Sequence, residues 1–215
     1  MKKFALFLVV TLCLGLLSGC RISVGQTTTA SNTTVPATST QPTTAAPTTV
    51  APTNPGTVGS SAAQVLGAIW DTYAQEERFA AYGGTVEQSV SDAPGDLNMI
   101  STEELTGSYL IPEDLLGDVE AAASLVHMMN SNIFTAAVLK LKPTGQPRAF
   151  ADQWRGVIRE NRWICGQPDR LLMMAIDEEH LLMAFGSSDA MDTFRSKANA
   201  VYGQSRTLFD EPIVA

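Results

Sequence analysis

The chain has 215 residues and a formal net charge of −8 at pH 7, with 45% hydrophobic and 17% charged residues. Residues 61–215 alone hold 11 basic and 22 acidic side chains, which is a net charge of −11. That balance argues against nucleic acid as a partner, because nucleic-acid-binding domains present basic patches to the phosphate backbone.

The first twenty residues have the pattern of an export signal. Two lysines follow Met1, residues 4–17 are apolar, and two small residues stand directly before Cys20. This is the three-part arrangement of a signal peptide. The apolar run of 14 residues is shorter than the roughly 20 residues that span a bilayer as a helix. We therefore predict a cleaved signal peptide at residues 1–19 rather than a permanent span.

The segment Leu17-Ser18-Gly19-Cys20 resembles the lipobox of bacterial lipoproteins. The resemblance implies that the sulfur of Cys20 carries a diacylglyceryl group and that Cys20 becomes the new N-terminus. Two acyl chains anchor a protein stably, since each buried methylene contributes about 0.8 kcal/mol. We therefore expect the membrane to be a partner through the lipid on Cys20, and the protein to lie on the extracytoplasmic face of the cell membrane. The alternative is an ordinary secreted protein whose cleavage site adjoins a cysteine.

Residues 20–60 are dominated by Thr, Pro, Ala and Ser and carry one charge, Arg21. A segment with so few large apolar groups is expected to be disordered. About 40 residues of flexible chain have a root-mean-square span of roughly 35 Å. The sequence therefore predicts a stalk between the anchor and a folded domain.

Residues 61–215 are predicted to form one domain, because 155 residues can bury a core without disulfides or metals. The chain has three cysteines. Cys13 leaves with the signal peptide and Cys20 is lipidated, so Cys165 is left without a disulfide partner. We interpret Cys165 as a small buried hydrophobic residue.

The domain begins with helical patterns. Apolar residues at spacings of three and four predict a helix over residues 62–73, capped by Ser60 or Ser61. After a polar stretch, Ser101 is expected to cap a short helix, with Glu104 closing the capping box. Pro112 is expected to open a second short helix.

Strand signals follow. The apolar runs 121–129 and 133–141 flank Asn-Ser-Asn, and the runs 171–176 and 181–185 flank a polar turn, so each pair predicts a β-hairpin. One amphipathic helix is expected between the hairpins, over residues 148–162, and another after them. We therefore predict an α+β fold. Its core would be a ββαββα antiparallel sheet of about four strands, with helices on one face and N-terminal helices before it.

Residues 134–202 resemble an uncharacterised domain family found in lipoproteins of Gram-positive bacteria. The resemblance rests on the succession of a strand, a polar helix, a strand pair and a closing helix, and on no diagnostic motif. It implies the fold and a Gram-positive lipoprotein, and it implies no activity and no functional residues.

The motifs of known chemistries are missing from the sequence. Neither His127 nor His180 has a second ligand at a metal-binding spacing, and no phosphate-binding loop or nucleophile elbow is present. We expect His127 to be a buried or half-exposed strand residue and His180 to be solvated in a turn. No catalytic, cofactor-binding or metal-binding residue is predicted.

Acidic residues offer two weaker possibilities. Four of them could act as acid and base in glycan hydrolysis: Glu103, Glu104, Glu113 and Asp114. The favoured interpretation is that they stabilise helix starts, where carboxylates interact well with the dipole. Asp92, Asp96 and Asn98 could bind calcium, but their spacing is not that of an EF-hand and a turn is favoured.

Charge is distributed unevenly, because residues 61–120 hold twelve acidic side chains and one basic one, whereas residues 140–170 hold seven basic and three acidic. The expected helix carries four arginines on one side: Arg148, Arg155, Arg159 and Arg162. This face could contact an anionic polymer such as a wall teichoic acid. The favoured alternative is internal pairing, with Arg148 bonded to Asp152 and the acidic half of the domain nearby.

Two hypotheses of function follow. The first is a lipid-anchored, non-catalytic module that binds an envelope component, a protein or a small solute. The second is a cell-envelope hydrolase that uses acidic residues. A hydrolase should show a cleft with at least two converging carboxylates, whereas a module should show a flat or grooved surface.

Overall fold

The computed structural model describes residues 60–129, 133–164 and 166–213, which all belong to one unit, residues 49–215. The predicted signal peptide, Cys20, the predicted stalk up to residue 59 and Cys165 lie outside the described residues.

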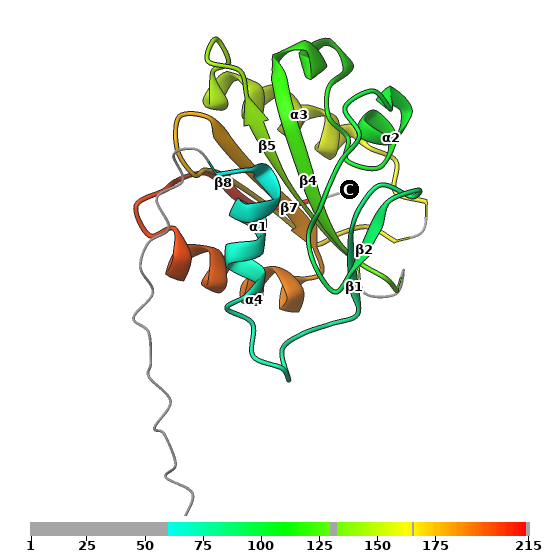
Figure 1. Cartoon of the computed structure of the whole chain (residues 1–215), viewed down its shortest axis with the longest axis vertical. Helices are drawn as coiled ribbons and strands as arrows, with labels where there is room; N and C mark the ends of the chain where they lie inside the picture. Colours follow the sequence, from blue (N-terminus) through cyan, green and yellow to red (C-terminus); the bar gives the residue numbers. More distant parts are fainter. Residues whose placement is uncertain (1–59, 130–132, 165, 214–215) are drawn as a thin grey trace, which may run out of the picture. The chain divides into compact units, whose positions relative to one another are not determined.

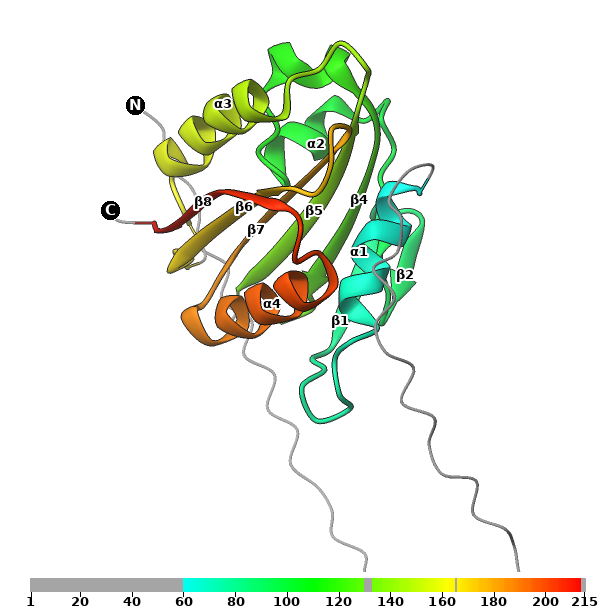
Figure 2. The same cartoon turned by 90° about the vertical axis from the view of Figure 1, so that its left-hand side faces the viewer.

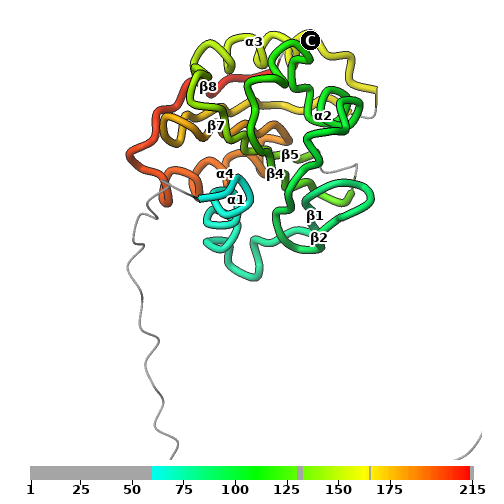
Figure 3. Tube along the Cα trace, turned by 45° about the horizontal axis from the view of Figure 1, so that its top comes forward, coloured from blue at the N-terminus to red at the C-terminus, as the bar shows by residue number. Residues whose placement is uncertain are grey.

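The described residues contain an antiparallel sheet of eight strands (Figure 1). The strands are β1 (Ala81–Gly84), β2 (Ser89–Ser91), β3 (Gly95–Asp96), β4 (Val119–His127), β5 (Phe134–Leu141), β6 (Arg170–Ala175), β7 (His180–Gly186) and β8 (Arg206–Pro212). Their order is β2-β1-β4-β5-β7-β6-β8, and β3 also pairs with β4. The helices are α1 (Ala62–Trp70), α2 (Thr102–Gly107), the 3₁₀ helix η1 (Glu113–Asp118), α3 (Pro147–Glu160) and α4 (Ser188–Val201). Figure 3 traces residues 71–80 from α1 to β1.

Helices cover both faces of the sheet. Helices α1 and α4 pack on one face, and α2, η1 and α3 pack on the other, as Figure 2 shows for α3 and α4. The strands supply apolar side chains to both sides, because successive residues of a strand point to opposite faces. In β7, Leu182 belongs to the core under α1 and α4, and Leu181 and Met183 belong to the core under α3. The prediction of helices on one face was therefore wrong.

The α+β class is confirmed, as are both predicted hairpins, β4–β5 and β6–β7. The four-stranded core is contradicted, because the sheet extends at both sides of these hairpins. β8 returns after α4 and pairs with β6, and β1 pairs with β4. The N-terminal strands fall in the stretch that the sequence showed only as polar. They come close to one another because Gly83 has no side chain, and a Cβ at that position would collide with the backbone of Gly95 and Ser124.

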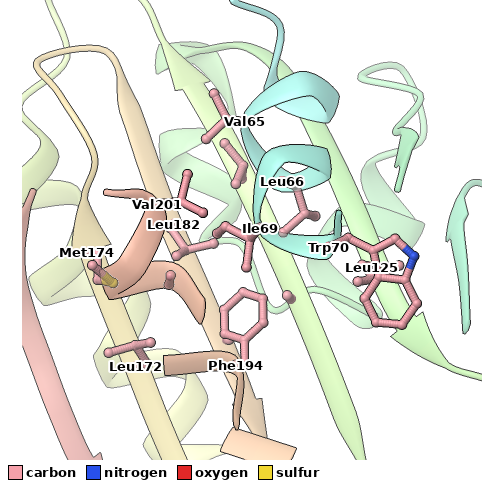
Figure 4. Close-up of a cluster of buried hydrophobic side chains, with 14 of the residues drawn as sticks. Val65, Leu66, Ile69, Trp70, Leu125, Leu172, Met174, Leu182, Phe194 and Val201 are labelled. Atoms are coloured by element: carbon pink, nitrogen blue, oxygen red, sulfur yellow. The ribbon is translucent and has the colours of Figure 1, made fainter. Parts of the chain in front are cut away.

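The core under α1 positions the start of the domain. Val65, Leu66 and Ile69 on α1 point toward Leu182 and Phe194, and all are almost completely buried (Figure 4). Helix α1 begins with a complete capping box. Ser61 Oγ accepts from the N–H of Gln64, and Gln64 Oε1 accepts from the N–H of Ser61. Of the two caps that the sequence allowed, Ser60 and Ser61, the structure uses Ser61.

The second predicted capping box does not form. Ser101 is the N-cap residue of α2, but its side chain makes no capping hydrogen bond. Glu104 instead reaches away from the helix start, and its Oε1 accepts from the N–H of Val86 at 3.3 Å. This bond ties α2 to the turn between β1 and β2.

Candidate functional site

An apolar hollow lies at the end of the sheet where β4 ends and β5 begins. It has a volume of about 210 Å³. Its lining combines the two neighbouring strands with the loop after α3: Ser108, Val126, His127, Met129, Ile133, Phe134, Thr135, Trp163, Ile164, Gly166 and Phe185. None of these residues is an acid, a lysine or an arginine. We call this feature the apolar hollow.

Large apolar side chains around the hollow are exposed to solvent. Ile164 is 94% exposed, Met128 60% and Met129 58%. Single exposed apolar residues are common, but Met129 and Ile164 both line this hollow, and Met128 precedes Met129 in the chain. Exposed apolar residues that gather in this way form a patch of the kind that marks an interaction site.

Aromatic residues that line the hollow pack against other rings on both sides of the sheet. On the side of α1 and α4, the ring of Phe134 lies 5.2 Å from the rings of Phe79 and of Phe194. On the side of α3, the ring of Trp163 lies 5.0 Å from that of Phe185. Phe134 and Phe185 are buried, so the hollow is set into the core and not only into a surface loop.

His127 supplies the titratable group of the hollow. Its ring is stacked on Phe79, with centroids 4.7 Å apart and an angle of 13° between the planes. The Nδ1 atom accepts a hydrogen bond from the N–H of Met129 at 3.0 Å. Burial lowers the pKa of His127, so the ring is neutral at pH 7 and its hydrogen lies on Nε2. The predicted strand position of His127 is confirmed.

The hollow lies at the opposite end of the sheet from the start of the domain. Phe134 pairs with Gly186 at one end of β5 and β7, and Lys140 pairs with His180 at the other. The carbonyl of Ser60 contacts His180. Six residues of strand separate the two ends, a distance of about 20 Å. The hollow thus lies at the opposite end of the sheet from Ser60.

Comparison with known protein families, with curated proteins and with solved structures finds no match to this chain. The resemblance to a Gram-positive lipoprotein family therefore stays a prediction. Within the described residues, no helix is long and apolar enough to cross a membrane.

Two of the four candidate acids for hydrolysis come together. Glu103 and Glu104 line a second, open hollow of about 550 Å³ between the β1–β2 turn and α2, and Glu87 joins them there. Glu113 and Asp114 lie in the first turn of η1 and do not line this hollow. Glu104 already accepts a backbone hydrogen bond, and all four candidates lie in helical first turns, as the structural interpretation expects.

Two of the three calcium candidates, Asp92 and Asn98, make local contacts, and the third, Asp96, lies in β3. The carboxylate of Asp92 lies 3.4 Å from the guanidinium of Arg78. Asn98 Oδ1 accepts from the N–H of Ile100 at 3.0 Å, which is the bond of an Asx turn. Across the described parts of the chain, no group of three His, Cys, Asp or Glu residues is placed to hold a metal ion.

The arginine face of α3 is paired with β8. Arg155 donates two hydrogen bonds to Glu211, at 2.6 and 2.8 Å, which lower the pKa of Glu211 and raise that of Arg155. Arg159 lies 3.8 Å from the same carboxylate, and Arg148 pairs with Asp152 at 3.1 Å. The pair of Arg148 and Asp152 was predicted. The other acidic partner comes from β8, which the sequence did not identify as a strand.

His180 is the residue that sequence reasoning placed least well. It was expected in solvent, yet its side chain is fully buried. The missed signal is strand alternation, because His180 stands two residues before Leu182 and four before Ala184, which both face the α1 core.

The contacts of the apolar hollow could not be predicted, because Met129 and Trp163 are brought together only by the sheet.

Proposed function

We propose that this protein is a lipid-anchored, extracytoplasmic, non-catalytic module that binds a protein partner of the cell envelope through the apolar hollow. The anchor part of the proposal rests on the lipobox-like sequence before Cys20. The binding part rests on one observation: exposed apolar side chains surround a hollow that opens at the end of the sheet farthest from Ser60.

The size of the hollow favours a protein partner over a small solute. Sites for small molecules measure about 300–1,000 Å³, and this hollow measures about 210 Å³. It suits one apolar side chain of a partner, because interface hot spots are anchors of this kind in well-packed pockets. The neutral ring of His127 provides a donor for a backbone carbonyl beside that anchor.

The hydrolase alternative rests on the hollow that Glu87, Glu103 and Glu104 line. Catalytic carboxylates in glycosidases have different environments, so that one stays protonated while the other is ionised. Here Glu87 and Glu103 are both exposed, and Glu104 accepts a hydrogen bond from the backbone N–H of Val86. These environments favour a structural role for the acids.

The experiment is photo-crosslinking on intact cells with a crosslinking amino acid at position 129. We expect one specific partner, and we expect its capture to fall at least tenfold when Ile164→Asp is added. Ile100→Asp is the matched control, because Ile100 is 89% exposed and does not line the apolar hollow.

Capture that Ile164→Asp leaves unchanged would refute the use of the apolar hollow. A parallel assay with isolated envelope material tests the alternative. Degradation of a glycan by the protein, lost in Glu103→Gln with Glu104→Gln, would replace the module by a hydrolase.

A further inference from the structure

The apolar hollow continues into the open, acidic hollow between the β1–β2 turn and α2. A narrow space of about 80 Å³ lies between the two hollows. This space shares Val126 and Thr135 with the apolar hollow. It shares Val86 and Glu104 with the acidic hollow, and Ser108 lines all three. The three spaces therefore join into one groove beside α2, which we call the α2 groove.

The two ends of the α2 groove differ in chemistry. Met129 and Ile164 are exposed at the apolar end, and Val86, which is 88% exposed, lies in the middle. The far end carries the exposed carboxylates of Glu87 and Glu103. A metal ion or a small cation would use only the acidic end, whereas a ligand that fills the groove contacts apolar side chains at one end and negative charge at the other.

The negative charge of the acidic end is not neutralised by the rest of the described chain. The lining of this end holds no lysine, arginine or histidine, and neither Glu87 nor Glu103 forms an ion pair among the described residues. Arg78, the one basic residue of the acidic half of the domain, contacts Asp71 and Asp92 instead. The position of Glu103 in the first turn of α2 stabilises the helix and still leaves its charge open to a cation from outside.

The sheet sets the length of the groove. Thr135 on β5, Val126 on β4 and Tyr82 on β1 are cross-strand neighbours that all line the middle space. Neighbouring strands lie about 4.8 Å apart, so this part of the groove spans about 10 Å. An extended chain covers about 3.3 Å per residue. About three residues of extended chain therefore bridge the two ends.

We propose that the α2 groove binds an extended segment of the partner protein that carries a large apolar side chain and, three or more residues away, a lysine or an arginine. The apolar side chain enters the apolar hollow, and the basic side chain lies between Glu87 and Glu103. The inference rests on the function proposed above and adds the chemistry of the partner. Charge complementarity favours this partner, because opposite charges across an interface raise the association rate and suppress wrong partners.

The test is selection from a display library of random twelve-residue peptides. The target is the full chain in nanodiscs of zwitterionic phosphatidylcholine, whose lipids do not attract basic peptides. We expect the enriched peptides to combine a large apolar residue with a lysine or an arginine three or more positions away. Fluorescence anisotropy then measures the Kd of the enriched peptides as synthetic molecules.

The two ends should respond differently to substitution. Ile164→Asp should weaken binding about tenfold, because an unpaired carboxylate at the apolar end is costly to desolvate. Glu87→Gln together with Glu103→Gln should weaken binding about fivefold, because each exposed ion pair contributes little. This double variant should also lose most of the salt dependence of binding between about 0.05 and about 0.5 M, since salt screens exposed charges.

Glu113→Gln together with Asp114→Asn is the matched control. It removes the same charge from two exposed acids that do not line the α2 groove, so binding should be unchanged. Equal weakening by the two double variants would overturn the site for the basic side chain.

Two further outcomes separate this inference from the proposed function. Enriched peptides that depend on Ile164 but show no preference for a basic residue would overturn the inference and leave the apolar hollow as the binding site. A library that yields no peptide sensitive to Ile164→Asp would overturn the binding of an extended segment. The crosslinking experiment at position 129 decides the proposed function independently, because it detects a folded partner as well.

Discussion

At the end of the sheet where β5 begins, aromatic and apolar side chains line a hollow. At the opposite end, where β7 begins, the buried ring of His180 contacts the half-buried carboxylate of Asp177. The exposed side chains of the apolar end, Met129 and Ile164, have no N–H or O–H groups, so they can contact a partner without losing a hydrogen bond. The polar end tolerates only one arrangement, because each buried donor and acceptor must be satisfied. One end is therefore suited to binding and the other to fixing the start of the domain.

The largest effect is expected at the apolar end. Phe134 is 1% exposed and its ring contacts Phe79 and Phe194. Replacing a buried phenylalanine by alanine leaves a cavity, so Phe134→Ala should lower the free energy of unfolding by about 3–5 kcal/mol. Urea denaturation measures the change. Ile164→Ala is the control in the same hollow, and its effect should stay within about 0.5 kcal/mol because the side chain is exposed. Similar losses for the two variants would show that the patch around Ile164 is part of the core.

A smaller effect is expected at the polar end, where the capping box of α1 stands next to the contact between Ser60 and His180. Ser61→Ala removes the acceptor for the N–H of Gln64 and should lower the free energy of unfolding by about 1 kcal/mol. Ser101→Ala is the matched control, because Ser101 is an N-cap residue whose side chain makes no capping bond. The same denaturation assay should show almost no change for the control. Equal losses at the two serines would contradict the assignment of the cap.

The central hairpins were predictable because their strands are nearly continuous apolar runs. The same runs, 171–176 and 181–185, also carried the signal for two covered faces, since a strand with one exposed face alternates between apolar and polar residues. β8 could not be predicted in this way. Its Asp210 is paired with Arg195 on α4, and its Glu211 is paired with Arg155 on α3. The charges that made β8 look solvated are neutralised only in the folded protein.

The candidate site shows the same limit. Sequence reasoning identified His127 as a strand residue, but the neighbours that make it part of a hollow come from the loop after α3, at Trp163 and Ile164. No periodic pattern connects these segments. The exposure of Ile164 and Met129 is likewise a property of the packed domain.

The smallest predicted effect is the pH dependence that His127 adds at the apolar end. Burial lowers the pKa of His127 from its ordinary value of 6.5, so the unfolded chain binds a proton that the folded chain excludes. The contribution of the neutral ring to stability is therefore complete above about pH 6.5 and is lost as pH falls toward the lowered pKa.

His127→Gln tests this dependence, because glutamine can still accept from the N–H of Met129 and does not titrate. Thermal unfolding measured at several pH values should show that the original chain loses stability relative to the variant only on the acidic side of about pH 6.5. Taking the difference between the two proteins cancels the titration of every group that they share. Parallel curves would mean that burial does not hold the ring of His127 in its neutral form.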